Sequence, residues 1–309
     1  MKTMCALIKR NTKLFFADKG LFFVSLITPA ILLVLYVTFL GNVYTDSLQM
    51  AAGEMEISDD IMRGFAGAQL ISSILAVSCV TVSFCSNMLM VQDKANGTLR
   101  DLSVSPVRPQ TLSMSYYIST FASTLIVCLS ATVICLIYVA ITGWFMSILD
   151  VVLLVLDVFI LCLFGVALSS VIGFFLSSQG QISAVGTMVS SGYGFVCGAY
   201  MPLSQFSEGL RDVLMFLPGT YGTSLVRNHA MRGVLEEMEK KGMPTEFVDS
   251  VRDNFDCTLY FFDNEVGIGI MYAVICTTVA LLIGLYVLMN ILREKRKAKY
   301  TKNLTDLAP

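Results

Sequence analysis

The chain has 309 residues, a mean hydropathy of +0.72 and a charged content of only 14%. Soluble domains carry about 25% charged residues, so this composition excludes an ordinary water-soluble protein of the same length. Its charges also fall in a few blocks separated by long uncharged stretches. This pattern indicates that lipid is the main solvent of the chain.

The uncharged stretches predict an all-α integral membrane fold with six transmembrane helices in one domain, residues 1–309. A spanning helix needs roughly 20 apolar residues, so the two longest stretches must each be divided. One divides at Thr142-Gly143-Trp144 and the other at the polar cluster 177–181. The expected spans are residues 21–40, 66–91, 116–141, 150–176, 182–200 and 266–292.

Residues 2–18 precede the first expected span and form an amphipathic helix by periodicity. Leu7, Ile8 and Phe15 fall on one face, and Lys9 and Lys13 fall on the opposite face. The pattern predicts an interfacial helix on the inner leaflet, with lysines directed toward anionic headgroups. The alternative is a solvated basic segment that only leads into the span.

The distribution of basic residues predicts the orientation of the spans. Of the 21 Lys and Arg, 14 lie in the N-terminal segment, the loop between spans two and three, and the C-terminal tail. The positive-inside rule therefore places both termini in the cytoplasm of a multi-pass protein of the plasma membrane.

The loop between spans five and six, residues 201–265, is expected to be an extracellular insert with eleven acidic and six basic residues. Its apolar patch 213–217 is too short to span a bilayer and could dip into the outer leaflet. Beyond the patch, residues 234–241 and 246–255 are expected to form short charged helices.

The sequence offers little support for catalysis, and we expect no catalytic residue and no cofactor in this chain. It has no G-x-x-x-x-G-K-[ST] motif for ATP and no G-x-S-x-G motif. His229, the single histidine, is interpreted as a surface residue of the outer loop. The nine cysteines contain no C-x-x-C pair, and most lie in expected spans, so a metal or redox site is not expected.

Asp157 is the one ionisable residue well inside an expected span. Burial of a charge in lipid is costly, so such a residue usually faces the bundle interior or a water-filled cavity. It could lie on a transport path, or it could hold a structural hydrogen bond to a Ser, Thr or Gln of a neighbouring helix.

Small residues recur every four positions in two of the expected spans and allow close helix approach. They predict helix packing within one chain, although a contact between subunits stays open. The positions are Gly165, Ser169 and Gly173 in span four, and Gly186, Ser190, Gly194 and Gly198 in span five.

The short charged loop of residues 92–108, between spans two and three, carries the most information. Gly97 can end one helix and Thr98 can cap the next. Residues 98–104 would then form a two-turn helix that ends before Pro106. Such a helix at the inner mouth of the bundle is suited to a partner protein, whereas the simpler alternative is a connecting turn.

At this loop the sequence resembles the ABC-2 type permeases, the membrane subunits of type V ABC exporters. The resemblance rests on Gly97-Thr98-Leu99, then Leu102, then Ser105-Pro106. It extends to the N-terminal amphipathic helix, the six expected spans, and the outer segments Met201-Pro202-Leu203 and Leu217-Pro218-Gly219-Thr220-Tyr221. Gln92 stands where the family commonly has an acid, and the outer insert is longer than in compact drug exporters.

The resemblance implies a dimer, with itself or with a related permease, in which each chain binds a separate ABC ATPase subunit. ATP and Mg²⁺ would be bound by that partner, and substrate would move outward between the two permeases. No nucleic-acid partner is expected. The coupling residues implied are Asp93, Lys94, Gly97, Thr98, Leu99, Arg100, Asp101, Leu102 and Pro106.

Two other classes of function remain open from the sequence. A secondary transporter usually places several ionisable residues at the midplane, and here only Asp157 qualifies. A membrane receptor or an immunity protein could act through the outer loop. The substrate also stays open between a drug, a peptide, a lipid-linked glycan and sodium.

Overall fold

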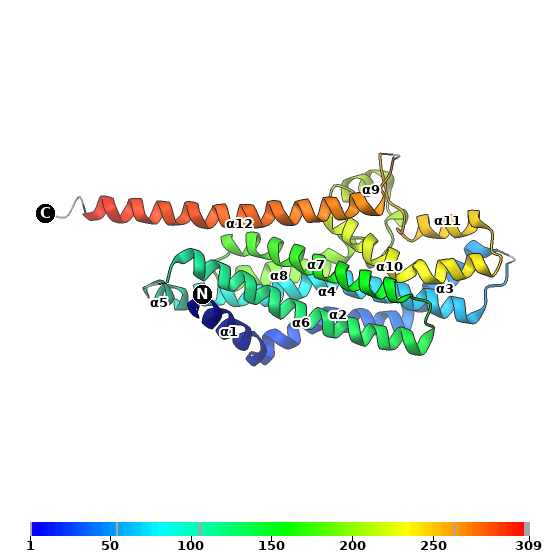
Figure 1. The fold of residues 1–309 in the computed structure, drawn as a ribbon, viewed down its shortest axis with the longest axis horizontal. Coiled ribbons are helices and arrows are strands. Elements are labelled where there is room, and N and C mark those ends of the chain that lie inside the picture. Colours follow the sequence, from blue (N-terminus) through cyan, green and yellow to red (C-terminus); the bar gives the residue numbers. More distant parts are fainter. Residues whose placement is uncertain (1, 54, 105–106, 263, 306–309) are drawn as a thin grey trace.

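The computed structural model describes residues 2–53, 55–104, 107–262 and 264–305, which form a long helical bundle with one short hairpin (Figure 1). Helices that precede the outer region are α1 (Lys2–Ala17), α2 (Lys19–Leu35), the π-helical turn η1 (Tyr36–Leu40), α3 (Gly41–Ala52), α4 (Asp59–Ala95), α5 (Thr98–Val104), α6 (Pro109–Thr142), α7 (Ile148–Phe175) and α8 (Gln179–Val196). The remaining elements are the 3₁₀ turn η2 (Leu203–Gln205), α9 (Glu208–Leu214), α10 (Pro218–Lys240), α11 (Thr245–Asn254), the antiparallel strands β1 (Tyr260–Phe261) and β2 (Asn264–Glu265), and α12 (Ile268–Thr305).

Among the residues that the structure describes, five helical segments are long and apolar enough to cross a membrane, so the all-α membrane fold is confirmed but the count of six is not. These segments are 19–52, 59–95, 109–142, 148–175 and 268–293. The expected fifth span, residues 182–200, corresponds to α8, which has 18 residues and does not reach the same apolarity. Its serines, threonine and glycines lower its hydropathy, and it ends at Val196 rather than at Tyr200.

The two breaks predicted within uncharged stretches are confirmed. Helix α6 ends at Thr142 and α7 begins at Ile148, with the Ser147 side chain capping the new helix. Helix α7 ends at Phe175, and Ser178 caps α8 in the same way. Both caps form a reciprocal capping box, in which the serine oxygen accepts an orphan backbone N–H.

Helix α4 is the centre of the bundle, because it packs against α2, α6, α7, α8 and α10. Figure 1 shows it running between these helices for most of their length. Most of its residues from Ile61 to Val91 are buried, which explains why its sequence is apolar or small on every face. A helix surrounded by other helices needs no amphipathic stripe.

Helix α7 lies close against the α4 backbone at Gly165. A Cβ atom at that position would lie 2.7 Å from the Cys79 carbonyl oxygen and 3.0 Å from the Val80 Cα. Further along the same crossing, the Asn87 amide donates a 2.6 Å hydrogen bond to the Ser169 carbonyl. The stripe of small residues in α7 therefore packs within the chain, as the sequence predicts.

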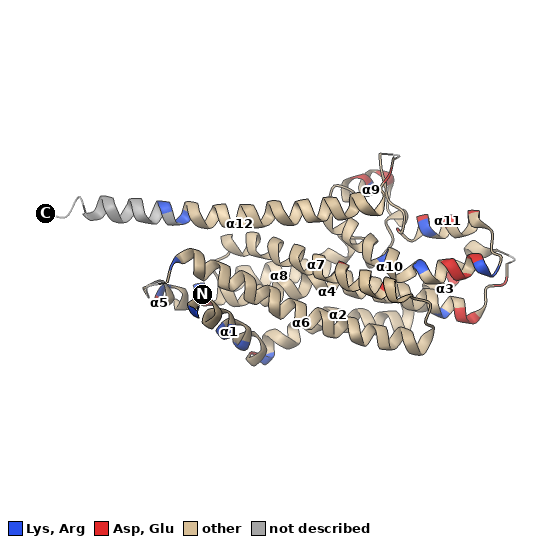
Figure 2. Cartoon of the chain, in the orientation of Figure 1, with Lys and Arg blue, Asp and Glu red and all other residues tan. Residues whose placement is uncertain are grey.

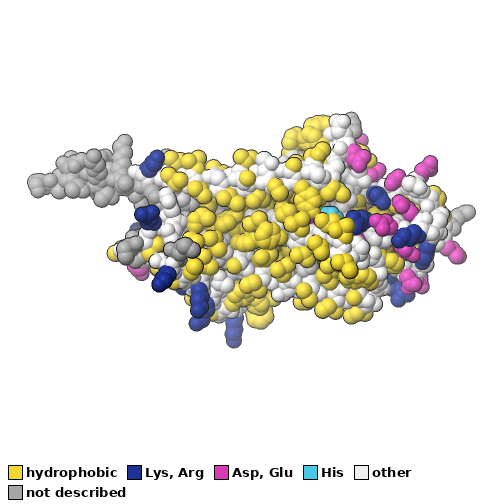
Figure 3. All heavy atoms as spheres, viewed as in Figure 1, with side chains coloured by type: hydrophobic (Ala, Val, Ile, Leu, Met, Phe, Trp, Pro, Cys, Tyr) yellow, Lys and Arg dark blue, Asp and Glu magenta, His cyan; other side chains and the backbone are white. Residues whose placement is uncertain are grey.

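Charged residues gather at the two ends of the bundle and leave an apolar belt between them. Figure 2 shows Lys and Arg on α1, α5 and α12 at one end, and most of the Asp and Glu near α3, α10 and α11 at the other. Figure 3 shows the broad hydrophobic surface that separates these ends. The first residues of α1 and the last described residues of α12 both lie toward the basic end (Figure 1).

The region after α8 differs from the expected pair of short charged helices. Helix α10 starts at Pro218 rather than near residue 234, and most of its residues are buried against α4, α7 and α12. Helix α11, residues Thr245–Asn254, agrees with the expected second helix. Residues of the expected outer insert therefore form α10, a long helix that packs within the bundle. Helix α11, which follows it, lies at the acidic end (Figure 2).

Candidate functional site

The short helix α5 occupies the residues that the sequence predicts. Gly97 has a φ of +84°, a conformation that glycine adopts without strain, and it separates the end of α4 from Thr98 at the start of α5. Leu99 and Leu102 pack against an apolar cluster drawn from four helices. That cluster consists of Leu7 on α1, Met90 and Val91 on α4, Leu112 and Tyr116 on α6, and Ile182 on α8.

Other residues of α5 are exposed at the surface of the chain. Arg100 and Asp101 are exposed, and Val104 is 86% exposed. A helix of this length is only marginally stable alone, so its apolar contacts hold it in place. It therefore offers an exposed charged and apolar face on a fixed support.

Asp93 lies near the C-terminal end of α4, where its carboxylate bonds to side chains of two other helices of the chain. Arg10 of α1 donates to its Oδ2 at 2.9 Å, and the Tyr116 hydroxyl of α6 donates to the same oxygen at 2.5 Å. The Asp93 carboxylate is thereby buried and shared by two donors. This junction ties α1, α4 and α6 together within one turn of the α4–α5 break.

Lys94 caps the carboxyl end of α7. Its Nζ donates to the carbonyl oxygens of Gly173, Phe174 and Leu176 at 2.9–3.1 Å. These are carbonyls that the end of a helix leaves unpaired, and a cation there also complements the helix dipole. The Lys94 ammonium lies 5.7 Å from the centre of the Phe174 ring.

The structure thus divides the implied coupling residues into two groups. Asp93 and Lys94 face the chain and fix the end of α4, whereas Arg100 and Asp101 lie on the exposed face of α5. Pro106 lies outside the described residues.

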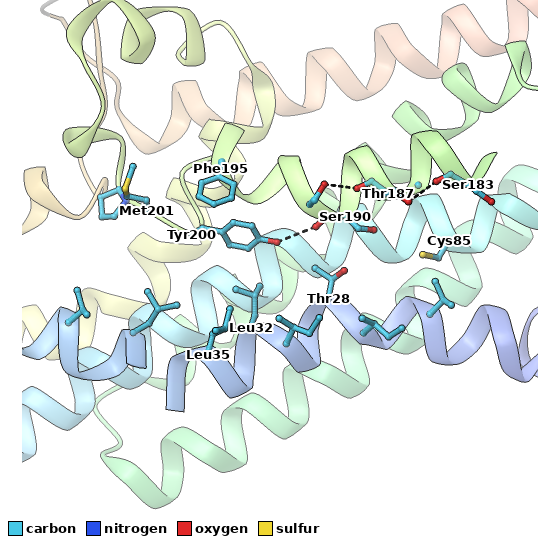
Figure 4. A pocket seen from close by; sticks show the side chains of 18 of the residues that line it. Thr28, Leu32, Leu35, Cys85, Ser183, Thr187, Ser190, Phe195, Tyr200 and Met201 are labelled. Carbon is cyan, nitrogen blue, oxygen red and sulfur yellow. Dashed lines mark hydrogen bonds between the residues drawn. The ribbon is translucent and has the colours of Figure 1, made fainter. Parts of the chain in front are cut away.

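A second feature is an open groove of about 880 Å³ between α2 and α8 (Figure 4). Its floor includes Cys85 and Met88 of α4, and its outer end is formed by the segment Tyr200–Gln205. Thr28, Leu32 and Leu35 of α2 face Ser183, Thr187 and Ser190 of α8 across it (Figure 4). None of the described residues that line the groove is charged.

Several hydroxyl groups along the groove donate to backbone carbonyl oxygens. Thr187 donates to the Ser183 carbonyl at 2.9 Å, and Ser191 donates to the Thr187 carbonyl at 2.7 Å. The Tyr200 hydroxyl donates to the Ser190 carbonyl at 3.3 Å (Figure 4). The surface that remains for a ligand is consequently apolar, and its volume falls within the range of small-molecule pockets.

A third feature is the buried group Asp157, His229 and Tyr272, which joins α7, α10 and α12. The His229 Nδ1 lies 2.5 Å from Asp157 Oδ2, and the Tyr272 hydroxyl donates to Oδ1. Asp157 is 1% exposed and His229 is 4% exposed. The interpretation of His229 as a surface residue was wrong, because α10 returns into the bundle and carries the ring to a carboxylate.

Two more ion pairs hold α10. Arg232 lies 2.6 Å from Asp150, the capping residue of α7, and the fully buried Arg227 lies 3.0 Å from Asp256. Arg227 also donates to the Gly198 carbonyl at 2.9 Å. Burial raises the pKa of Asp256 to about 6, although the Arg227 guanidinium favours the ionised form.

The sequence alone could not identify these partners, because the members of each pair lie far apart in the chain. One signal was available: Asp150 and Asp157 are two helical turns apart on α7, and His229 and Arg232 share one face of α10. Acidic residues on one face of a helix and basic residues on one face of another are what two paired helices require, although the spacings here differ, seven residues on α7 and three on α10.

Taken together, the apolar belt, the helical bundle and the supported inner helix define a polytopic membrane protein of the transporter class. The family model of the ABC-2 type transporters matches residues 2–230, about three-quarters of the chain, and the protein belongs to that family. The match ends within α10. A search of the curated proteins finds no match to this chain. The resemblance seen in the sequence is therefore confirmed, and the chain is a permease of the ABC transporter type.

Proposed function

We propose that this permease is the membrane subunit of an ATP-driven exporter and that it works as a dimer with a separate ATPase bound to each chain. The observation that carries the proposal is α5, a short helix with an exposed face on a rigid support. ATP and Mg²⁺ would be bound by the ATPase. The chain would lie in the plasma membrane, and the basic end of the bundle would face the cytoplasm together with both termini.

In this mechanism the ATPase grips Arg100, Asp101 and Val104 and moves α5 when it closes around ATP. The Asp93 junction and the Lys94 cap convert that movement into a shift of α1, α6 and α7 relative to α4. The ATPase can shift the permease between two conformations only if it binds them with different affinities. A loosely held α5 would not transmit that difference to the rest of the permease. The packing of Leu99 and Leu102 against the apolar cluster supports the view that α5 is held firmly.

The groove between α2 and α8 supports an apolar or amphiphilic substrate. It has no charged lining residue among those described, and several of its hydroxyls are already bonded to backbone. A second permease placed against this face would enclose the groove and create a path between the two chains. Sodium fits this surface poorly, because a hard cation requires several oxygen ligands.

Copurification tests the proposal most simply. The full chain is isolated from its own membranes in mild detergent, and bound proteins are identified by mass spectrometry. We expect a P-loop ATPase that lacks spans of its own, in equal numbers with the permease. Isolation of the permease free of any P-loop protein, under conditions that preserve membrane complexes, would contradict it.

The Asp157–His229 pair favours a second candidate, a proton-coupled secondary transporter. Two titratable side chains buried in the bundle are a feature of such proteins. The candidate is weaker because neither side chain lines the groove. Transport by sealed vesicles that stops when the proton gradient is collapsed, and that needs no ATP, would favour it over the exporter.

A further inference from the structure

Three cysteines from three different helices converge at one point inside the bundle. They are Cys79 on α4, Cys128 on α6 and Cys162 on α7. Their sulfur atoms all lie within 4.8 Å of one another, and each residue is completely buried. No sequence motif indicates this cluster, because the three positions are separated by 49 and 34 residues.

We propose that these three thiols form a trigonal site for a soft monovalent metal ion, Cu(I). Metal–sulfur bonds of about 2.3 Å place three sulfurs around a central ion about 4 Å apart. The observed separations need to contract by less than about 1 Å to reach that geometry. Soft sulfur ligands select Cu(I) over hard cations.

The charge of the site also favours Cu(I). When one thiol loses its proton and a copper–sulfur bond replaces its sulfur–hydrogen bond, one thiolate and two thiols hold Cu(I) in a neutral group. A neutral group avoids the large penalty of a net charge in a low-dielectric interior. The released proton leaves to solvent, and no electron is transferred.

Zn²⁺ fits the same residues less well. Structural zinc requires four ligands in a tetrahedron, and the cluster supplies three. The nearest carboxylate along the chain is Asp157, and both of its oxygens are bonded to His229 and Tyr272. The site therefore discriminates between the two metals by ligand number as well as by charge.

The chain contains a matched control for this site. Cys85 lies on α4 with Cys79, and Cys135 lies on α6 with Cys128, and both are buried outside the cluster. The variant Cys79→Ala with Cys128→Ala removes two ligands. The variant Cys85→Ala with Cys135→Ala removes two buried thiols from the same helices and leaves the site intact.

The test loads the purified full-length protein with Cu(I) under anaerobic, reducing conditions and then applies the chelator bicinchoninate. We expect wild type and the Cys85/Cys135 variant to retain one copper per chain, with three sulfur neighbours by X-ray absorption. The Cys79/Cys128 variant should retain at least 10-fold less. Zn²⁺ offered in place of copper should be removed by a chelator from all three proteins.

Several results would overturn the proposal. One is wild-type protein that retains no copper, and another is equal retention by the Cys79/Cys128 variant. Nitrogen or oxygen neighbours in the absorption spectrum would do the same. If the double variant is not recovered folded, the two single variants Cys128→Ala and Cys135→Ala are compared instead. Equal copper retention by these two proteins would contradict the site.

Discussion

Asp157 and His229 are 72 residues apart in the sequence and are in direct contact in the structure. Asp157 lies about 14 Å along α7 from its first residue, at 1.5 Å per residue, so the pair is well inside the span. The sequence predicts that Asp157 is either a path residue or a structural one. Its closed contacts with His229 and Tyr272 agree with a hydrogen-bonded role, but with partners other than Ser, Thr or Gln.

Replacement of His229 by Ala should destabilise the protein by about 1–3 kcal/mol, because a buried carboxylate loses a partner. Asp157→Asn should relieve part of that cost, so the double variant should be less destabilised than the sum of the two single variants. Thermal unfolding of the four proteins in one detergent measures this coupling. Strict additivity would show that the two side chains do not interact.

Asp256 gives the protein a defined pH dependence. Burial raises its pKa from 3.8 to about 6, so the folded protein holds this proton more tightly than the unfolded chain. The stabilisation is therefore complete below about pH 4 and is lost as the pH rises through 6, a change on the order of 3 kcal/mol.

Unfolding midpoints measured between pH 4 and pH 7 check this prediction. Wild type should lose stability over that interval, and Asp256→Asn should lose less of it. Asp249→Asn, at an exposed position of α11, is the control and should follow wild type. A slope in Asp256→Asn equal to that of wild type would assign the effect to another group.

At the scale of helices, the local signals in the sequence are sufficient where a helix is bounded by its own residues. Gly97 and Thr98 correctly predict α5 because the turn between α4 and α5 depends on local backbone conformation. Ser147 and Ser178 mark helix starts for the same reason. Their hydrogen bonds join residues within one turn, which a sequence pattern can record.

Helix α10 could not be predicted in the same way. Its polar residues Arg227, His229 and Arg232 suggest an exposed segment, and their partners Asp256, Asp157 and Asp150 lie elsewhere in the chain. The polarity that implied exposure belongs to ion pairs with other helices and loops, in which Arg227 and His229 are buried and Arg232 is half-buried. Composition therefore could not predict the burial of α10, because the partners of its charged side chains lie elsewhere in the chain.

The crossing of α7 and α4 gives a prediction at this scale. Gly165→Ala should destabilise the protein by about 1–3 kcal/mol, because the new methyl group meets backbone atoms of α4 at 2.7–3.0 Å. Gly284→Ala on α12 meets nothing within 4 Å and should be neutral or stabilising by up to about 1 kcal/mol. Thermal unfolding of both variants decides this, and equal effects would mean that the crossing is loose.

For the molecule as a whole, the groove between α2 and α8 is the expected wall of the transport path. Ile31→Trp places a large ring on its lining and should reduce export while ATPase binding stays intact. Ile137→Trp on α6 is a matched control, since the two isoleucines are 54% and 56% exposed and only Ile31 lines the groove. Equal transport by the two variants would place the path elsewhere.

The overall plan of the molecule followed from apolar length and charge, which determine what can lie in lipid. Segment 182–200 shows the limit of that reasoning, because α8 is a polar, glycine-containing helix that borders the groove. A helix that lines a groove need not be as apolar as one that faces lipid. Hydropathy alone therefore could not establish whether this segment crosses the bilayer.

The central claim is that α5 transmits the action of a separate ATPase to this permease. The direct measurement is the ATPase activity of the complex in liposomes, together with export of its substrate, for wild type and for Arg100→Glu with Asp101→Arg. Both positions are exposed on α5. We predict that the variant folds normally but loses export and the stimulation of ATP hydrolysis by the permease. Export and stimulation at wild-type levels would contradict the assignment of α5 as the coupling helix.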